Sequence, residues 1–169
     1  IAESGRLTLT LLNDVLELSK IEAGGAVVAR EPVPIGKLIV ECADWHRQAL
    51  EGRPVNLQVA IDPRVPSSII GDPARLRQIV GNLLGNAIKF TERGTITVEA
   101  SVVEAQWLEI AVRDTGIGIA PDRRDQIFDR FAQADETIHR RFGGTGLGLA
   151  ISTGLAHLMG GSLNVHSVE

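Results

Sequence analysis

The stretch "GGTGLGLAIS", residues 143–152, constrains the fold more than any other part of the chain. Four glycines surround a threonine and run directly into an apolar segment, a pattern typical of a loop that opens a helix and holds phosphate. Its spacing excludes two common nucleotide folds. A P-loop needs a Lys-Ser or Lys-Thr pair after its last glycine, but Leu149 and Ala150 follow Gly148. A dinucleotide fingerprint needs Gly or Ala at a position that is Leu149 or Ile151 here.

The composition narrows the remaining possibilities. A net charge of −4 gives no electrostatic reason to expect a nucleic-acid partner. The single cysteine, Cys42, excludes an intrachain disulfide and a cysteine-based zinc cluster. No apolar run approaches the roughly 20 residues of a membrane span, and no signal peptide is visible. Because the chain begins at Ile1 inside a predicted helix, we interpret it as a piece of a longer protein.

Residues 1–22 are predicted to form one long amphipathic helix, which the glycines of residues 23–25 end. Two interpretations of its apolar stripe are open: it packs on the following domain, or its partner helices lie outside this chain. We favour the second, because no other segment resembles a second bundle helix. The stripe consists of Leu7, Leu11, Leu12, Val15, Leu18 and Ile21.

From about residue 26 onward, predicted strands and helices are mixed. Four segments alternate apolar and polar residues, as half-buried strands do. One sheet covered on one face by helices is the economical arrangement, so we predict a two-layer α/β sandwich. The predicted strands are 55–62, 95–103, 107–114 and 162–168, and the predicted helices are 36–51, 73–90 and 147–159.

Residues 114–120, "DTGIGIA", predict a site for a flat ligand that carries an amino group. Asp114 shares its strand parity with the apolar residues of segment 107–114, so its carboxylate is expected to point toward the buried face. Gly116 and Gly118 leave no side chains around it, so a ligand can approach the backbone closely. The alternative is a turn in which Asp114 accepts a hydrogen bond from its own backbone.

The helix predicted over residues 73–90 carries a second candidate site. Asn82, Asn86 and Lys89 fall within one narrow arc, together with Arg75. Carboxamide oxygens suit a Mg²⁺ ion that keeps several waters, and Lys89 is placed to reach phosphate as a point charge. A solvated helix face is the alternative, although Glu and Lys would be more usual there than Asn. The opposite, core-facing stripe is predicted to be Leu76, Ile79, Val80, Leu83 and Ala87.

The glycine stretch is predicted to wrap phosphate oxygens with its backbone, helped by the helix that begins near Leu147. Upstream, residues 132–142 have no apolar periodicity and are expected to form a mobile lid. Arg140 and Arg141 in this segment are candidates to meet the outer phosphates, or they serve solubility alone.

Four motifs together resemble those of sensor histidine kinases. "NLLGNAIKF", "DTGIGIA", "IFDRFAQAD" and "GGTGLGLAIS" are similar to the N box, first glycine box, phenylalanine box and second glycine box of that family. They stand in the same order and at typical separations. "LLNDVLELSKIEAG" resembles the second helix of the family's dimerisation and phosphoacceptor hairpin. The resemblance covers nearly the whole chain, and four ordered motifs make it specific.

The resemblance implies the Bergerat ATP-binding fold, a mixed sheet with three helices, over residues 25–169. It implies that residues 1–24 are the second hairpin helix, with the first hairpin helix and the last strand of the catalytic domain absent. It further implies a homodimer through the bundle helices, a cytoplasmic location, and a response-regulator receiver domain as partner. Membrane anchoring of the parent protein stays open.

The resemblance also implies a role for each candidate residue. Asp114 would bind the adenine amino group of ATP, and Asn86 would coordinate Mg²⁺. Asn82 and Lys89 would contact metal or phosphate. Phe128 and Phe131 would anchor the lid, and Phe90 would border the adenine. The implied nucleotide-binding residues are Asn82, Asn86, Lys89, Phe90, Asp114, Gly116, Gly118, Ile119, Phe131, Arg140, Arg141, Gly144, Thr145, Gly146, Leu147, Gly148 and Leu149.

The implied reaction is transfer of the γ-phosphoryl group of ATP to a histidine, for relay to an aspartate of a response regulator. None of the four histidines has the acceptor context, so the chain is expected to bind ATP without phosphorylating itself. A second hypothesis, an ATPase clamp related to DNA gyrase, is disfavoured because Asn82 stands where those enzymes have a glutamate base. A third, a domain that only relays conformation, is disfavoured by the intact Asn86, Asp114 and glycines.

Overall fold

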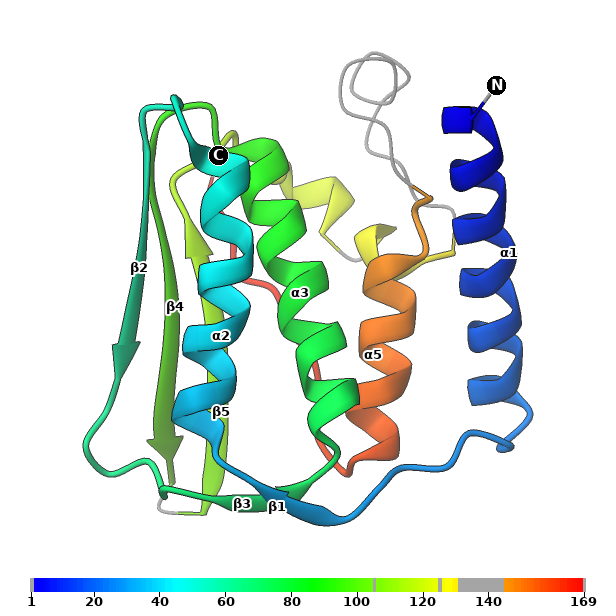
Figure 1. The fold of residues 1–169 in the computed structure, drawn as a ribbon, viewed down its shortest axis with the longest axis horizontal. Helices are drawn as coiled ribbons and strands as arrows, with labels where there is room; N and C mark the ends of the chain where they lie inside the picture. Colours follow the sequence, from blue (N-terminus) through cyan, green and yellow to red (C-terminus); the bar gives the residue numbers. More distant parts are fainter. Residues whose placement is uncertain (1, 105, 125, 131–144, 169) are drawn as a thin grey trace. The chain divides into compact units, whose positions relative to one another are not determined.

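A computed structural model describes residues 2–104, 106–124, 126–130 and 145–168 (Figure 1). The chain divides into two compact units. Residues 29–118 form one, which we name the sheet unit. Residues 1–28 and 119–169 form the other, which we name the helical unit. This division groups the N-terminal helix with the C-terminal part of the chain.

The sheet unit contains a mixed three-stranded sheet in the order β2-β4-β5. Strand β2 (Val55–Ile61) pairs in parallel with β4 (Gly94–Val103), and β4 pairs antiparallel with β5 (Trp107–Asp114). Helices α2 (Ile35–Arg47) and α3 (Pro73–Phe90) lie over one face of this sheet (Figure 1). The predicted two-layer α/β fold with a mixed sheet is therefore confirmed.

Two short strands of the sheet unit are absent from the sequence prediction. Strands β1 (Glu31–Val33) and β3 (Ile69–Gly71) form a separate antiparallel ribbon. A 3-10 turn, η1 (Gln48–Leu50), continues α2. Strands of three residues are too short to produce a recognisable alternation of apolar and polar residues.

Local chemistry sets both ends of α3 at the predicted residues. Asp72 is the N-cap, and its carboxylate accepts hydrogen bonds from the N–H groups of Ala74 (2.9 Å) and Arg75 (3.0 Å). Pro73 follows at the first helical position, where no N–H is required. The helix ends where Thr91 adopts an extended conformation.

The core of the sheet unit lies between α2, α3 and the inward face of β4. Alternate residues of β4 are buried, as a strand with one covered face requires. On α3 the predicted stripe is partly wrong: Leu83 is half-buried, whereas Leu84 and Ile88 are buried. The buried face of α3 is therefore rotated from the predicted stripe toward Leu84 and Ile88, because α3 packs against both α2 and the sheet.

The helical unit contains α1 (Ala2–Glu22), η2 (Pro121–Arg123), η3 (Gln126–Phe128) and α5 (Gly148–Leu158). As predicted, glycines end α1. Gly24 has a φ of +68°, and its N–H donates to the carbonyl of Ile21 (3.1 Å). The N–H of Gly25 donates to the carbonyl of Lys20 (3.0 Å), which completes a Schellman motif.

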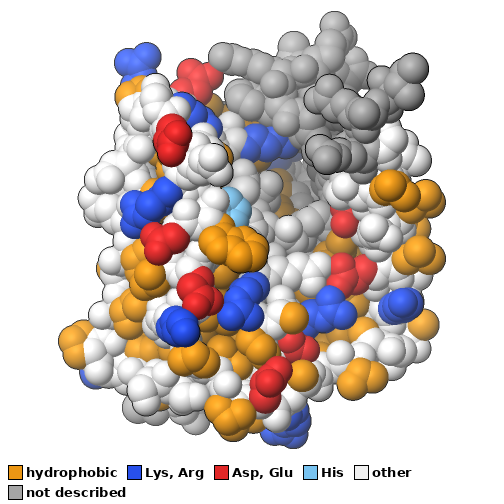
Figure 2. Space-filling model, viewed as in Figure 1, with side chains coloured by type: hydrophobic (Ala, Val, Ile, Leu, Met, Phe, Trp, Pro, Cys, Tyr) orange, Lys and Arg blue, Asp and Glu red, His pale blue; other side chains and the backbone are white. Residues whose placement is uncertain are grey.

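Helix α1 runs alongside α5 within the helical unit (Figure 1). Leu18 is buried, and Ile21 lies so close to Gly154 that an added Cβ would sit 2.7 Å from the Ile21 Cγ2. The apolar stripe of α1 is therefore divided between residues that pack on α5 and residues that stay exposed along the helix (Figure 2). The exposed apolar residues of α1 are Leu9, Leu12, Val15 and Leu16.

One sequence prediction for the helical unit is wrong. Residues 162–168 have no regular secondary structure, although their alternation predicted a strand. A strand needs a partner for its backbone, and the hydrogen bonds of this segment instead involve the hydroxyls of Ser162 and Ser167. Leu158, the last residue of α5, is 37% exposed.

Candidate functional site

The polar arc of α3 is not a solvated helix face. Asn82, Asn86 and Lys89 are all half-buried. Asn82 already interacts with the protein. The side-chain carboxamide of Asn86, in contrast, makes no hydrogen bond to any residue that the structure describes. A half-buried carboxamide without a protein partner is suited to a ligand, and its neutral oxygen fits a Mg²⁺ ion that retains water.

Lys89 and Phe90 stand together at the C-terminal end of this arc. The Lys89 Nζ lies 4.7 Å from the centroid of the Phe90 ring. Burial lowers the pKa of the Lys89 amine, because desolvation penalises its charged form. A partly desolvated ammonium gains most from an anionic ligand such as phosphate.

Asp114 is the last residue of β5 and lies opposite Ile96, which is fully buried. The predicted strand parity is therefore correct. The predicted burial of the carboxylate is wrong: Asp114 is exposed, because the strand ends here and glycines follow it. Its Oδ1 accepts a hydrogen bond from the N–H of Gly116 (2.8 Å) and a longer one from the Thr91 hydroxyl (3.5 Å).

The Gly116 hydrogen bond is the local turn that we considered as the alternative for this motif. It uses only one carboxylate oxygen. Among the residues that the structure describes, none donates to Oδ2 of Asp114. The turn therefore orients the carboxylate and leaves an acceptor for a ligand, so the two interpretations are compatible.

Gly116 brings this motif against the end of α3. An added Cβ would lie 2.5 Å from the Phe90 carbonyl oxygen and 2.7 Å from Oδ1 of Asp114. Only glycine fits this contact. Gly118 has a φ of +71°, a backbone conformation that also favours glycine. The sheet unit thus places Asp114, Gly116 and Phe90 side by side, with Asn86 one helical turn before Phe90.

The described part of the glycine stretch lies in the helical unit and opens α5 as predicted. Gly146 has a φ of +69°, Leu147 is the buried N-cap, and α5 begins at Gly148. The N–H of Leu147 donates to the Thr145 hydroxyl (3.3 Å). Leu149 is half-buried in the first turn. A glycine turn that enters the positive end of a helix is suited to an anion.

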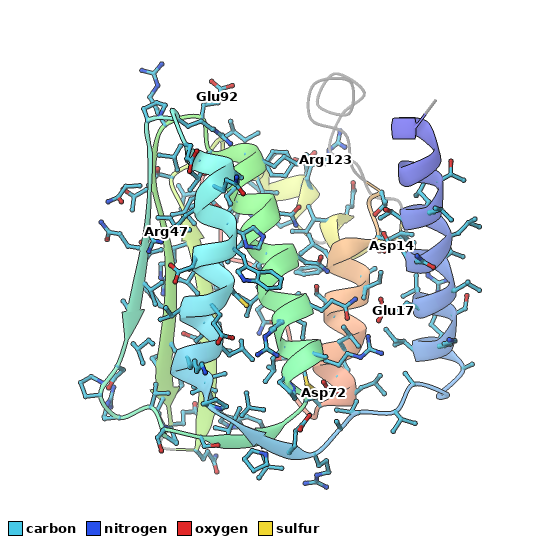
Figure 3. All side chains as sticks on the ribbon, viewed as in Figure 1. Asp14, Glu17, Arg47, Asp72, Glu92 and Arg123 are labelled. Atoms are coloured by element: carbon cyan, nitrogen blue, oxygen red, sulfur yellow. The ribbon has the colours of Figure 1, made fainter. Side chains whose placement is uncertain are left out.

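Two contacts that join α1 to the rest of the helical unit were not predicted from the sequence. The Thr145 hydroxyl donates to Oδ2 of Asp14 (2.9 Å), and Asp14 projects from α1 (Figure 3). Arg130 pairs with Glu22 at the end of α1. No sequence signal identifies contacts between residues so far apart in the chain.

The remaining predicted residues belong to the helical unit or lie outside the described residues. The N–H of Ile119 donates to the Ser167 hydroxyl (2.8 Å), and Phe128 is half-buried in η3. No described residues form a group of three or more His, Cys, Asp or Glu side chains that could hold a metal ion. Within the same residues, no helix has the length and apolar character that a bilayer span requires. Outside the described residues lie Phe131, Arg140, Arg141 and Gly144.

The chain matches a known family model and is similar to known proteins. Residues 71–169 match the family model described as "Histidine kinase-, DNA gyrase B-, and HSP90-like ATPase". The chain is 41% identical to the signal transduction histidine-protein kinase BarA of Escherichia coli (strain K12) over 174 residues, which cover 99% of this chain and 19% of BarA. It is also 41% identical to the sensor protein TorS of the same strain, over 99% of this chain and 18% of TorS.

Solved structures give the same result. The crystal structure of full-length ShkA in complex with AMPPNP matches with a TM-score of 0.83 and 37% identity, over 94% of this chain and 32% of that one. The chain spans about a fifth of the length of the curated relatives that it matches.

Proposed function

Because the chain belongs to the family of histidine kinase-, DNA gyrase B- and HSP90-like ATPases, as a catalytic domain of the sensor histidine kinase type, we propose that it transfers the γ-phosphoryl group of ATP to a histidine. The acceptor histidine lies on a helix outside this chain. The observation that carries the proposal is the Oδ2 atom of Asp114, which accepts no hydrogen bond from the described residues. The Gly116 N–H orients the carboxylate through Oδ1, and Gly116 itself lies against the end of α3, the helix that bears Asn86.

In this proposal Asp114 recognises the base. Its free carboxylate oxygen accepts a hydrogen bond from the adenine amino group, while the Gly116 N–H fixes the orientation of the carboxylate. Phe90 borders the base, and the absence of side chains at Gly116 and Gly118 lets the flat ring approach the backbone. A carboxylate acceptor favours adenine over a base that carries a carbonyl oxygen at that position.

Asn86 and Asn82 would hold Mg²⁺, which when bound neutralises the charge of the phosphate oxygens. Lys89 contributes its positive charge to the phosphates, and the turn from Thr145 to Gly148 contributes backbone N–H groups. Phe131, Arg140, Arg141 and Gly144 complete the proposed nucleotide-binding set. These residues position ATP and stabilise charge, which is most of what phosphoryl transfer requires of a protein.

Asn82 bears on the choice of nucleophile. Its carboxamide cannot accept a proton from water, so the residue does not activate water against the γ-phosphate. An imidazole nitrogen needs no such base, because its lone pair attacks phosphorus directly as the bond to ADP breaks. We therefore expect transfer to a protein histidine to outrun hydrolysis.

Helix α1 is proposed to be the second helix of the acceptor hairpin, with residues 1–24 as that element and residues 25–169 as the catalytic domain. The exposed leucines and valine of α1 fit a face that pairs in a bundle with the first hairpin helix and a second copy. A receiver domain of a response regulator would accept the phosphoryl group from the histidine.

The test is phosphoryl transfer in trans. The chain is mixed with γ-labelled Mg-ATP and with the acceptor hairpin of the parent protein, produced separately. Labelled phosphohistidine, stable in base and labile in acid, is the expected product. Without the acceptor hairpin, the chain should release little free phosphate. ATP hydrolysis without any labelled hairpin would instead support the ATPase-clamp alternative.

A further inference from the structure

Arg53 is a half-buried arginine outside every motif considered above. It lies in the turn between η1 and β2, and its backbone is held on both sides. The N–H of Arg53 donates to the carbonyl of Leu50 (3.0 Å), and its own carbonyl accepts from Val55 (2.8 Å). The base of the side chain is therefore fixed relative to the sheet.

The guanidinium of Arg53 caps the C-terminal end of α3. Its Nη2 donates to the carbonyl of Ile88 (2.9 Å) and to the carbonyl of Thr91 (2.7 Å). The last carbonyls of a helix have no partner within the helix, and a cation there also interacts favourably with the helix dipole. Among the residues that the structure describes, Arg53 forms no ion pair, so carbonyl capping is its principal interaction.

This cap lies next to the residues that form the proposed base site. Phe90 lies between the two capped carbonyls. Its own carbonyl is in contact with Gly116, where no Cβ fits. Thr91 is fully buried, and its hydroxyl donates to Asp114 (3.5 Å). A shift of the end of α3 would therefore move Phe90 and Asp114 together.

We propose that Arg53 is a positioning residue for base recognition: it fixes the end of α3 so that Phe90 and Asp114 keep the geometry that selects adenine. This inference rests on the proposed function, because it assigns the selected ligand to the Asp114 site. Arg53 itself touches neither the nucleotide nor the phosphates. Its loss should reduce discrimination between bases more than it reduces attraction for the triphosphate.

The chain offers a matched control. Arg47 lies in the same unit, on α2 (Figure 3), and its Nη1 likewise donates to a backbone carbonyl, that of Leu57 (2.9 Å). Leu57 belongs to β2, so this hydrogen bond supports the fold without reaching the end of α3. Arg53→Met and Arg47→Met each remove one arginine and keep an unbranched apolar stem.

The experiment compares the dissociation constants of Mg-ATP and Mg-inosine triphosphate, well below the unfolding midpoint of each variant. Inosine carries a carbonyl oxygen where adenine carries its amino group. We expect the parent chain and Arg47→Met to share one preference for ATP, and Arg53→Met to lose about tenfold of it. Arg53→Lys, which keeps a cationic donor, should retain most of the preference. Arg53→Gln gives the same comparison should Arg53→Met not fold.

The outcomes distinguish a failure of the proposed role of Arg53 from a failure of the proposed base site. Equal preference for ATP in the parent, Arg47→Met and Arg53→Met overturns the role of Arg53 and leaves the proposed base site intact. An equal loss in both methionine variants also overturns it, since the effect would then be one of general stability. A parent chain without any preference contradicts base recognition by Asp114, and the positioning role with it.

Discussion

The hydroxyl of Thr145 donates a hydrogen bond of 2.9 Å to Asp14, although the two residues lie 131 positions apart in the chain. The same hydroxyl accepts the N–H of Leu147 at the start of α5 (3.3 Å). Thr145 thus connects the glycine turn, which is proposed to hold phosphate, to the helix that is proposed to belong to the acceptor hairpin. A movement of α1 would therefore act on this turn through the Thr145 side chain.

Asp14→Ala is expected to loosen the docking of α1. The substitution removes a part-buried hydrogen bond to a carboxylate, which is worth about 1.5–3 kcal/mol. Limited proteolysis should then cleave the segment around residues 23–28 faster than in the parent. Asn13→Ala, on the exposed face of the same turn, is the control and should leave the cleavage rate unchanged. Equal rates for Asp14→Ala and the parent would show that the contact does not hold α1.

Asp72→Ala is expected to lower the free energy of unfolding by about 1–2 kcal/mol, the usual cost of losing an N-cap. The carboxylate also accepts the N–H of Ala29 (2.9 Å), so one substitution releases both the start of α3 and a distant loop. Chemical denaturation at neutral pH measures the difference. Asp72→Asn keeps the capping geometry and should cost less.

The same residue predicts a pH dependence. Burial alone would raise the pKa of Asp72, but the backbone N–H groups of Ala29, Arg75 and Ala74 outweigh burial and hold its pKa below 3.8. Because the folded pKa lies below the unfolded one, the stabilisation is complete above pH 3.8 and is lost as the pH falls further. The stability difference between the parent and Asp72→Asn should therefore shrink below pH 4. A difference that stays constant down to pH 2 would contradict this account.

Gly116→Ala is expected to destabilise the sheet unit by about 1–3 kcal/mol, because the new methyl group meets the Phe90 carbonyl and the Asp114 carboxylate. ATP affinity should fall with it. Gly85→Ala provides the control: this exposed glycine of α3 has nothing within 4 Å of an added Cβ, so alanine should stabilise the helix by about 0.5–1 kcal/mol. Thermal unfolding distinguishes the two directions.

The sequence predicts those parts of the fold that local chemistry determines. The bounds of α3 follow from Asp72 and Pro73 at its start, and the parity of Asp114 follows from the alternation along β5. The strand predicted over residues 162–168 failed because alternation reports which side chains are apolar and says nothing about a partner for the backbone.

Long-range contacts mark the limit of the sequence prediction. The exposure of Asp114 depends on where the covering elements stop, which no local pattern records. Arg53 is a single arginine in a polar turn, and only the fold reveals that its guanidinium reaches Thr91. The contact between Asp14 and Thr145 is equally invisible to periodicity and spacing.

The most direct test of the central claim is the affinity for Mg-ATP of Asp114→Asn, measured by equilibrium binding beside the parent chain. Asp44→Asn, an exposed substitution on α2, serves as the control. We predict that Asp114→Asn binds Mg-ATP about 10- to 100-fold more weakly, since an amide offers the adenine amino group a poorer acceptor than a carboxylate. Affinities that are equal in the parent, Asp44→Asn and Asp114→Asn would contradict the assignment of this carboxylate as the base-recognition group.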